Sequence, residues 1–179
     1  MATKTIRRGS LLAAGAAVAG ALALGAAPVA SAAPTAPAAP TAPTDGGTTL
    51  TATRSGVNAA AAAVITCKVR IHDPHYSHHA HAKDKHRVNV TADTKCTKKV
   101  ASLRIKMRLY KNGKPYKTTG WKSNTGKNTI SHSAARRCVK KQRYQGRAWV
   151  RVVFPPGYKP PTGSSTVTSK AVTIYKCAK

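Results

Sequence analysis

The sequence predicts an all-β fold, namely an antiparallel immunoglobulin-like β-sandwich of six or seven strands with two disulfides, which follows a disordered N-terminal region. Apolar and polar residues alternate with a period of two in several short segments. Turn-forming residues separate these segments, and no segment shows a sustained helical period. A small closed barrel is the alternative fold.

Residues 1–32 have the features of a secretory signal peptide. Lys4, Arg7 and Arg8 precede an uncharged run, and a small-x-small pattern ends at Ala32. The run consists mostly of Ala and Gly, so it is weakly apolar for a membrane span. We therefore expect cleavage after Ala32, export to the extracellular space or the cell wall, and no integral membrane segment.

Residues 33–63 are predicted to form a disordered linker, because Pro, Ala, Thr and Gly dominate and large apolar side chains are nearly absent. Such a segment buries too little surface to offset its ordering entropy. Residues 64–179 should then form the folded domain.

The chain has 31 Lys and Arg, four Asp and no Glu, for a formal charge of +27. The basic residues that precede the predicted domain are Lys4, Arg7, Arg8 and Arg54.

Strands are expected wherever apolar and polar residues alternate in the domain. In chain order, the expected inward-facing sets are Ile65, Cys67, Val69 and Ile71; Val88, Val90, Ala92, Thr94 and Cys96; Ala101, Leu103, Ile105, Met107 and Leu109; and Tyr144, Ala148, Val150, Val152 and Phe154. Each set has charged or hydroxyl-bearing residues at the intervening positions, which is typical of a strand with one buried face.

Further signals predict the remaining strands. Asn112-Gly113 is a strong hairpin signal, because both positions tolerate positive φ. A partner strand is therefore expected from Pro115 toward Trp121. Residues 126–134 are a further candidate, and a last strand is expected within residues 170–177.

The four cysteines of an exported chain predict a disulfide framework. Four cysteines allow three pairings. We favour Cys67–Cys96 and Cys138–Cys177, because each pair brackets one turn-rich loop between two strand candidates. Cys177 has the opposite parity to the apolar residues of the last strand, which requires a bulge or a sheet-edge position there.

Four short motifs of the domain carry a family resemblance. They are YKNGK at 110–114, WKSNTG at 121–126, a cysteine followed by Tyr-x-Gly at Cys138, Tyr144 and Gly146, and FPPGYKPPTGS at 154–164. With these motifs, the sequence resembles a family of small, functionally uncharacterised secreted proteins of actinobacteria that share a C-terminal PPGYxPP motif. The resemblance extends from Cys67 onward and implies a secreted, disulfide-linked β domain. It implies no activity, ligand or catalytic residue.

The basic excess is the strongest functional signal. A solubility role is normally served by mixed charges, whereas a large field of one sign attracts polyanions through counterion release. The expected binding residues are Arg104, Lys106, Arg108, Arg136, Arg137, Lys140, Lys141, Arg143, Arg147 and Arg151. The expected partners of this monomer are wall polymers or extracellular nucleic acid. No motif for specific nucleic-acid recognition is present. Trp149 could stack on bases or sugars, but we expect it to cover the core or a disulfide.

A histidine-rich loop gives an alternative function, metal binding. It contains His72, His75, His78, His79, His81 and His86. Neutral imidazoles bind zinc and copper, so the loop could assemble a site for either metal. The alternative is a plain polar loop whose histidines gain charge as the pH falls below about 6.5. We otherwise expect no cofactor.

An enzyme, such as a small secreted nuclease, is the third possibility. A nuclease of the two-histidine type needs a distant pair of histidines and a lysine. His132 could serve with one loop histidine, but no spacing selects that pair. The absence of Glu and the scarcity of Asp remove most carboxylate mechanisms, and no Gly-x-Ser-x-Gly or phosphate loop occurs. We therefore expect a binding protein without catalytic residues.

Overall fold

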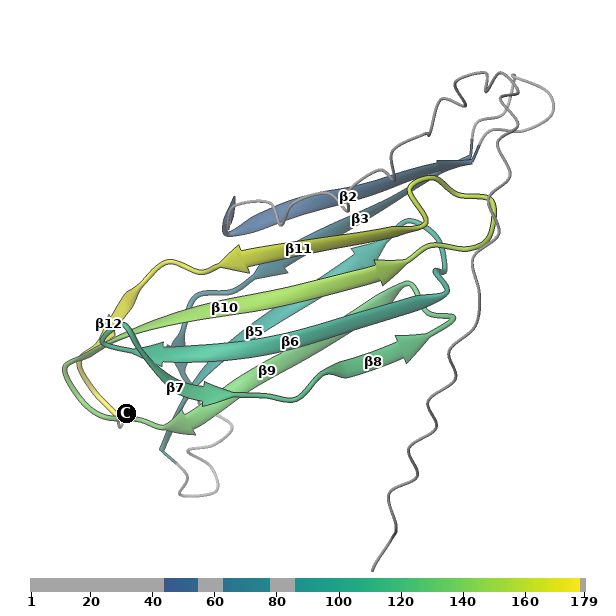
Figure 1. Cartoon of the computed structure of the whole chain (residues 1–179). Helices are drawn as coiled ribbons and strands as arrows, with labels where there is room; N and C mark the ends of the chain where they lie inside the picture. Colours follow the sequence, from purple (N-terminus) through teal and green to yellow (C-terminus); the bar gives the residue numbers. More distant parts are fainter. Residues whose placement is uncertain (1–43, 55–62, 78–85, 178–179) are drawn as a thin grey trace, which may run out of the picture. The chain divides into compact units, whose positions relative to one another are not determined.

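The computed structural model describes residues 44–54, 63–77 and 86–177 (Figure 1). All regular secondary structure in these ranges is β-strand. The strands form one sheet of seven and one of five. The two sheets pack face to face over a common core, which confirms the predicted β-sandwich. Neither sheet closes on itself, so the barrel alternative is wrong.

The predicted signal peptide, residues 1–32, lies outside the described residues. Within the described ranges there is no helix with the length and apolarity needed to cross a membrane.

The seven-stranded sheet is built on two long antiparallel strands, β6 (Ser102–Lys111) and β10 (Gln142–Val153). Four shorter strands flank them: β11 (Thr162–Thr168) and β12 (Val172–Ile174) pair with β10, and β7 (Lys114–Thr118) and β8 (Lys122–Thr125) pair with β6. At the edge, β1 (Thr44–Asp45) pairs with β11 in parallel, whereas the other pairs of this sheet are antiparallel.

The five-stranded sheet is antiparallel. Its strands are β2 (Gly47–Arg54), β3 (Ala63–Ile71), β4 (His75–Tyr76), β5 (Arg87–Cys96) and β9 (Thr129–Arg137). β3 lies between β2 and β5, and β5 also pairs with β4 and β9.

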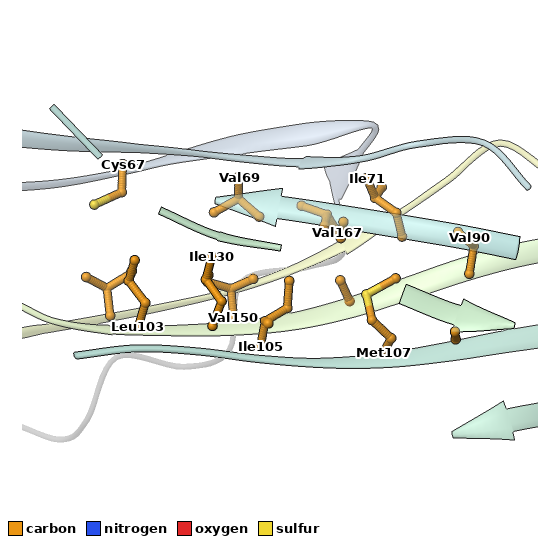
Figure 2. Close-up of a cluster of buried hydrophobic side chains, with 14 of the residues drawn as sticks. Cys67, Val69, Ile71, Val90, Leu103, Ile105, Met107, Ile130, Val150 and Val167 are labelled. Carbon is orange, nitrogen blue, oxygen red and sulfur yellow. The ribbon is translucent and has the colours of Figure 1, made fainter. Parts of the chain in front are cut away.

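The core lies between the sheets and consists of the inward members of the alternating segments. Figure 2 shows Val69 and Ile71 of β3 pointing toward Ile105 and Met107 of β6. The predicted inward residues are all buried except Ala101, which is half-buried and lies directly before β6. The alternation of apolar and polar residues predicted these strands, because each strand buries its apolar side in the core and exposes its polar side to solvent.

The predicted hairpin is confirmed, with φ of 50° at Asn112 and 76° at Gly113. The single partner strand from Pro115 to Trp121 is not present as such, because β7 ends at Thr118 and β8 begins at Lys122. At the break, the Thr119 hydroxyl accepts a hydrogen bond from the Met107 N–H at 2.9 Å. A side-chain hydroxyl thus accepts the hydrogen bond that a backbone carbonyl would accept in a regular ladder.

The remaining strands differ from prediction in extent. The candidate at 126–134 becomes β9, displaced toward Arg137, and the last strand is shortened to β12. The sequence reading missed β11, because its Gly, Ser and Thr residues give no apolar alternation. With the short edge strands included, the described residues form more strands than the six or seven expected.

The linker prediction for residues 33–63 is wrong for residues 44–54, which form β1 and β2. β2 pairs with β3 along its whole length, and its Ala52 is only 1% exposed. Its threonines favour extended structure. The backbone hydrogen bonds to β3 and the burial of Ala52 stabilise this strand, whereas large apolar side chains stabilise the other strands. The folded domain therefore begins before residue 64.

Both predicted disulfides are confirmed. Cys67–Cys96 joins directly opposed residues of β3 and β5, and Cys138–Cys177 joins the residue directly after β9 to the segment after β12. Because Cys177 lies beyond β12, the parity of that strand does not apply to it, and the expected bulge or sheet-edge position is not needed. Two disulfides and no free cysteine indicate folding in an oxidising environment.

Candidate functional site

The outer surface of the seven-stranded sheet brings together five of the predicted polyanion-binding cations. Arg104, Lys106 and Arg108 alternate with buried residues of β6, so their side chains lie on the outer side. In the register with β10, Arg104 is directly opposite Arg151 and Arg108 is directly opposite Arg147. Like charges that face each other across a strand pair destabilise a sheet. This surface therefore has an unfavourable self-energy that a bound anion would relieve.

Trp121 is close to both members of one of these opposed pairs. The guanidinium carbons of Arg104 and Arg151 lie 5.4 Å and 5.2 Å from the centroid of its ring. A cation over an aromatic face contributes about 0.5–1 kcal/mol at an exposed site. The indole thus offsets part of the repulsion and holds two guanidiniums close together, in a place where both remain exposed.

Tyr110 has the same relation to the second pair. Arg108 and Arg147 lie 5.9 Å and 5.7 Å from its ring centroid, and Arg108 also lies 5.3 Å from the ring of Trp149. Cations and rings therefore alternate across β6 and β10. We call this surface the ladder face; it comprises Arg104, Lys106, Arg108, Tyr110, Trp121, Arg147, Trp149 and Arg151.

The expectation that Trp149 covers the core or a disulfide is wrong. Trp149 alternates with the buried Ala148 and Val150 and is half-buried on the outer side, where it faces Lys106 of β6. With Trp121 and the hydroxyl-bearing residues of β11 it lines a shallow hollow of about 150 Å³. Both tryptophans of the chain therefore lie on the ladder face.

Acidic residues are scarce around the ladder face. Strands β6, β7, β8, β10 and β11 contain none, and Asp45 belongs to the edge strand β1. Among the side chains that the structure describes, the one contact between a basic and an acidic group joins His72 to Asp93, on the other sheet. The positive field of this surface is therefore only weakly compensated by the chain itself.

The other predicted cations lie elsewhere. Arg143 is on the outer side of β10, beyond the ladder face and opposite Thr173 of β12. Arg136 and Arg137 are on β9, and the Arg136 guanidinium donates to the Tyr116 carbonyl at 2.6 Å. Lys140 and Lys141 are exposed in the turn between β9 and β10. The predicted set of ten is therefore not one surface.

A second basic surface, on the outer side of the five-stranded sheet, was not singled out in the sequence. Lys68 of β3 is directly opposite Lys95 of β5, and both are exposed beside Arg70. They line a groove of about 400 Å³ together with Thr66, Asp93, Cys96 and Thr97. The alternation of β3 and β5 put these lysines on the outer face, but only the strand register shows that they meet.

The histidine loop is only partly described. His78, His79 and His81 lie outside the described residues. His72 Nε2 is 2.7 Å from Asp93 Oδ1, and His86 Nδ1 is 2.6 Å from the Tyr76 hydroxyl. The described ranges contain no cluster of three or more His, Cys or Asp residues suited to a metal. Zinc or copper binding by the whole loop stays a prediction.

His132, the candidate partner of a loop histidine in an enzyme, lies on β9 opposite the buried Ala92. It is therefore on the inner side of the five-stranded sheet, whereas His72 bonds to Asp93 on the outer side. Burial and the nearby Lys122 ammonium lower the pKa of His132, and a hydrogen bond with the Gly120 backbone opposes this. These two histidines do not form one site.

Comparison with known proteins identifies no relative. No protein-family model matches the chain, and no curated protein or solved structure matches it significantly. The resemblance to secreted actinobacterial proteins stays a prediction.

Proposed function

We propose that this protein is a secreted, non-enzymatic binding protein that attaches to anionic polymers, either cell-wall polymer or extracellular nucleic acid, through the ladder face. The proposal rests on two pairs of directly opposed arginines, Arg104 with Arg151 and Arg108 with Arg147. Aromatic rings lie close to both pairs. The two disulfides support a protein that works outside the cell.

The chemistry of the ladder face suits phosphate-rich chains. Guanidinium groups are planar and bind phosphate or carboxylate oxygens with two parallel hydrogen bonds. Outward residues of one strand repeat about every 6.6 Å, so the three cations of β6 recur at this spacing, and Arg147 and Arg151 of β10 at about twice it. An extended polymer with regularly spaced anions can therefore contact several of them at once, and each contact releases counterions.

The rings add a basis for discrimination among polyanions. Bases stack on aromatic side chains with a contribution of about 1–3 kcal/mol each. A polyol phosphate of the wall-polymer type has no ring that could stack. The hollow beside Trp121 and Trp149 also offers Ser164 and Thr166 hydroxyls as hydrogen-bonding partners.

The first test is the salt dependence of binding to single-stranded DNA. Affinity should fall linearly on a log–log scale, with a slope of about −0.7 per phosphate contacted. An Arg104→Gln, Arg151→Gln variant should bind at least about tenfold more weakly at physiological salt. The matched control is Lys170→Gln, Lys176→Gln, which removes the same charge from exposed positions outside the ladder face and outside the predicted set. Affinity that does not depend on salt, or equal losses in the two variants, would contradict the proposal.

The second test compares polymer classes by tryptophan fluorescence, which reports on the ladder face because both indoles lie there. Single-stranded DNA, inorganic polyphosphate and purified wall teichoic acid are titrated separately. Stacked bases should quench the emission, whereas ring-free polymers that bind by charge should leave most of it. Unchanged emission on saturation with all three polymers would place the binding surface elsewhere.

A further inference from the structure

The outer side of the five-stranded sheet has the chemistry of a second anion site. We call this surface the groove face; its groove is lined by Thr66, Lys68, Arg70, Asp93, Lys95, Cys96 and Thr97. Its three cations are exposed, and the two lysines are directly opposed across β3 and β5. Directly opposed like charges destabilise a strand pair.

The acid of this groove is already engaged. Asp93 is directly opposite Arg70 in the strand register, but its carboxylate accepts a hydrogen bond from His72 at 2.7 Å. Asp93 is the one acid of the lining, against three cations, so the groove keeps a net positive charge. The threonine hydroxyls supply additional donors for an anionic oxygen.

The groove face differs from the ladder face in one respect. No aromatic side chain lines its groove, so it can bind phosphate or carboxylate groups by charge and hydrogen bonds but cannot stack a ring. The two faces lie on opposite sides of the sandwich, because the core side chains of both sheets point toward each other between them (Figure 2). Packed sheets are about 10 Å apart, so the faces point away from each other across the domain.

We propose that the groove face is a second polyanion site, so that one molecule joins two separate anionic polymer chains. This inference rests on the proposed function, because the ladder face must hold the first chain. The protein would then act as a cross-linker and not only as a binder. A chain held on each side by several charge contacts stays in place, since dissociation requires all contacts of one face to break together.

The test is a capture assay with two single-stranded DNAs that are not complementary. One is immobilised and the second carries a fluorophore, and the full-length secreted protein is added below saturation. The wild-type protein should retain the labelled strand on the surface. A Lys68→Gln, Lys95→Gln variant should still bind the immobilised strand with an affinity within about threefold of the control, but retention of the labelled strand should fall to background. The matched control is again Lys170→Gln, Lys176→Gln.

The outcomes separate the two proposals. If the wild-type protein binds neither strand, the proposed function itself fails. If it binds the immobilised strand and captures no second strand, binding stands and cross-linking is wrong. If the Lys68→Gln, Lys95→Gln variant captures as well as the control, the second chain is held by another surface, such as that of a protein dimer, and the groove face is not the site. Light scattering of the protein without polymer shows whether it forms the dimer that this last outcome would require.

Discussion

At the scale of single residues, Gly146 sets how closely the two sheets approach. It is an inward-facing position of β10, and a Cβ placed there would lie 2.3 Å from Val90 Cγ2 and 3.1 Å from Ile71 Cδ1. Its N–H donates to the Ser169 hydroxyl at 2.8 Å, which ties the chain after β11 to the same point. A glycine here is therefore a packing requirement and not a turn signal.

Gly146→Ala should destabilise the domain by about 1–3 kcal/mol, because β5 and β10 must move apart to admit the methyl group. Gly120→Ala is the matched control, since nothing lies within 4 Å of the added Cβ there. The control should change the free energy of unfolding by less than about 0.5 kcal/mol. Urea denaturation measures both, and equal stability of the two variants would contradict the close approach.

His132 gives a pH-dependent prediction at the same scale. Because burial and Lys122 lower its pKa in the folded state, the unfolded chain binds the proton first as the pH falls below about 6.5. The contribution of this group to stability should therefore be present at neutral pH and decline on acidification. His132→Gln should lose less stability between about pH 7 and pH 5 than the wild-type protein.

Thermal unfolding at a series of pH values measures this effect. The remaining histidines are the same in both proteins, so only the difference between the two profiles is informative. Parallel profiles would show that the environment of His132 does not disfavour its protonated form.

At the scale of elements, β2 shows that an edge strand can lack an apolar pattern. Gly47–Arg54 is dominated by threonine, yet it pairs with β3 throughout and places Ala52 in the core and Leu50 against it. It also covers the edge that β3 would otherwise expose. Edge strands with unpaired backbone groups are sites of aggregation.

A chain that begins at Val64 should therefore be less stable than one that begins at Thr44. The loss of the Ala52 and Leu50 contacts alone corresponds to about 1–3 kcal/mol. The shorter chain should also aggregate more readily, since β3 becomes an open edge. Thermal unfolding and light scattering of the two chains test this, and equal stability would show that β2 is dispensable.

At the scale of the whole molecule, the charge has two opposing consequences for salt dependence. A net charge of +27 repels itself in the compact state. Raising the salt from about 20 mM to about 300 mM screens this repulsion. The melting temperature of the polymer-free protein should therefore rise with salt, whereas its affinity for polyanions should fall.

Differential scanning calorimetry and binding titrations in the same buffers measure the two trends. The Arg104→Gln, Arg151→Gln variant should show a smaller rise in melting temperature, because one opposed pair of the ladder face is removed. A melting temperature that falls with salt would mean that ion pairs within the protein dominate over repulsion.

The sequence by itself predicted the β-sandwich, most inward residues of its four main strands and the favoured disulfide pairing. These depend on the side-chain period of two and on the cysteine positions, which are local properties. Arg104, Lys106 and Arg108 could be assigned to one outer face for the same reason. The charge excess likewise needed no structure.

Only the tertiary structure decided which cations and rings meet. Trp121 lies outside the strands, so no periodicity places it, yet it is in contact with arginines from both β6 and β10. The pairing of Lys68 with Lys95 depends on the register of strands separated by the histidine loop. Register is a relation between distant segments, fixed by the packing of both sheets on one core, and a one-residue shift would have moved each of these side chains to the opposite face.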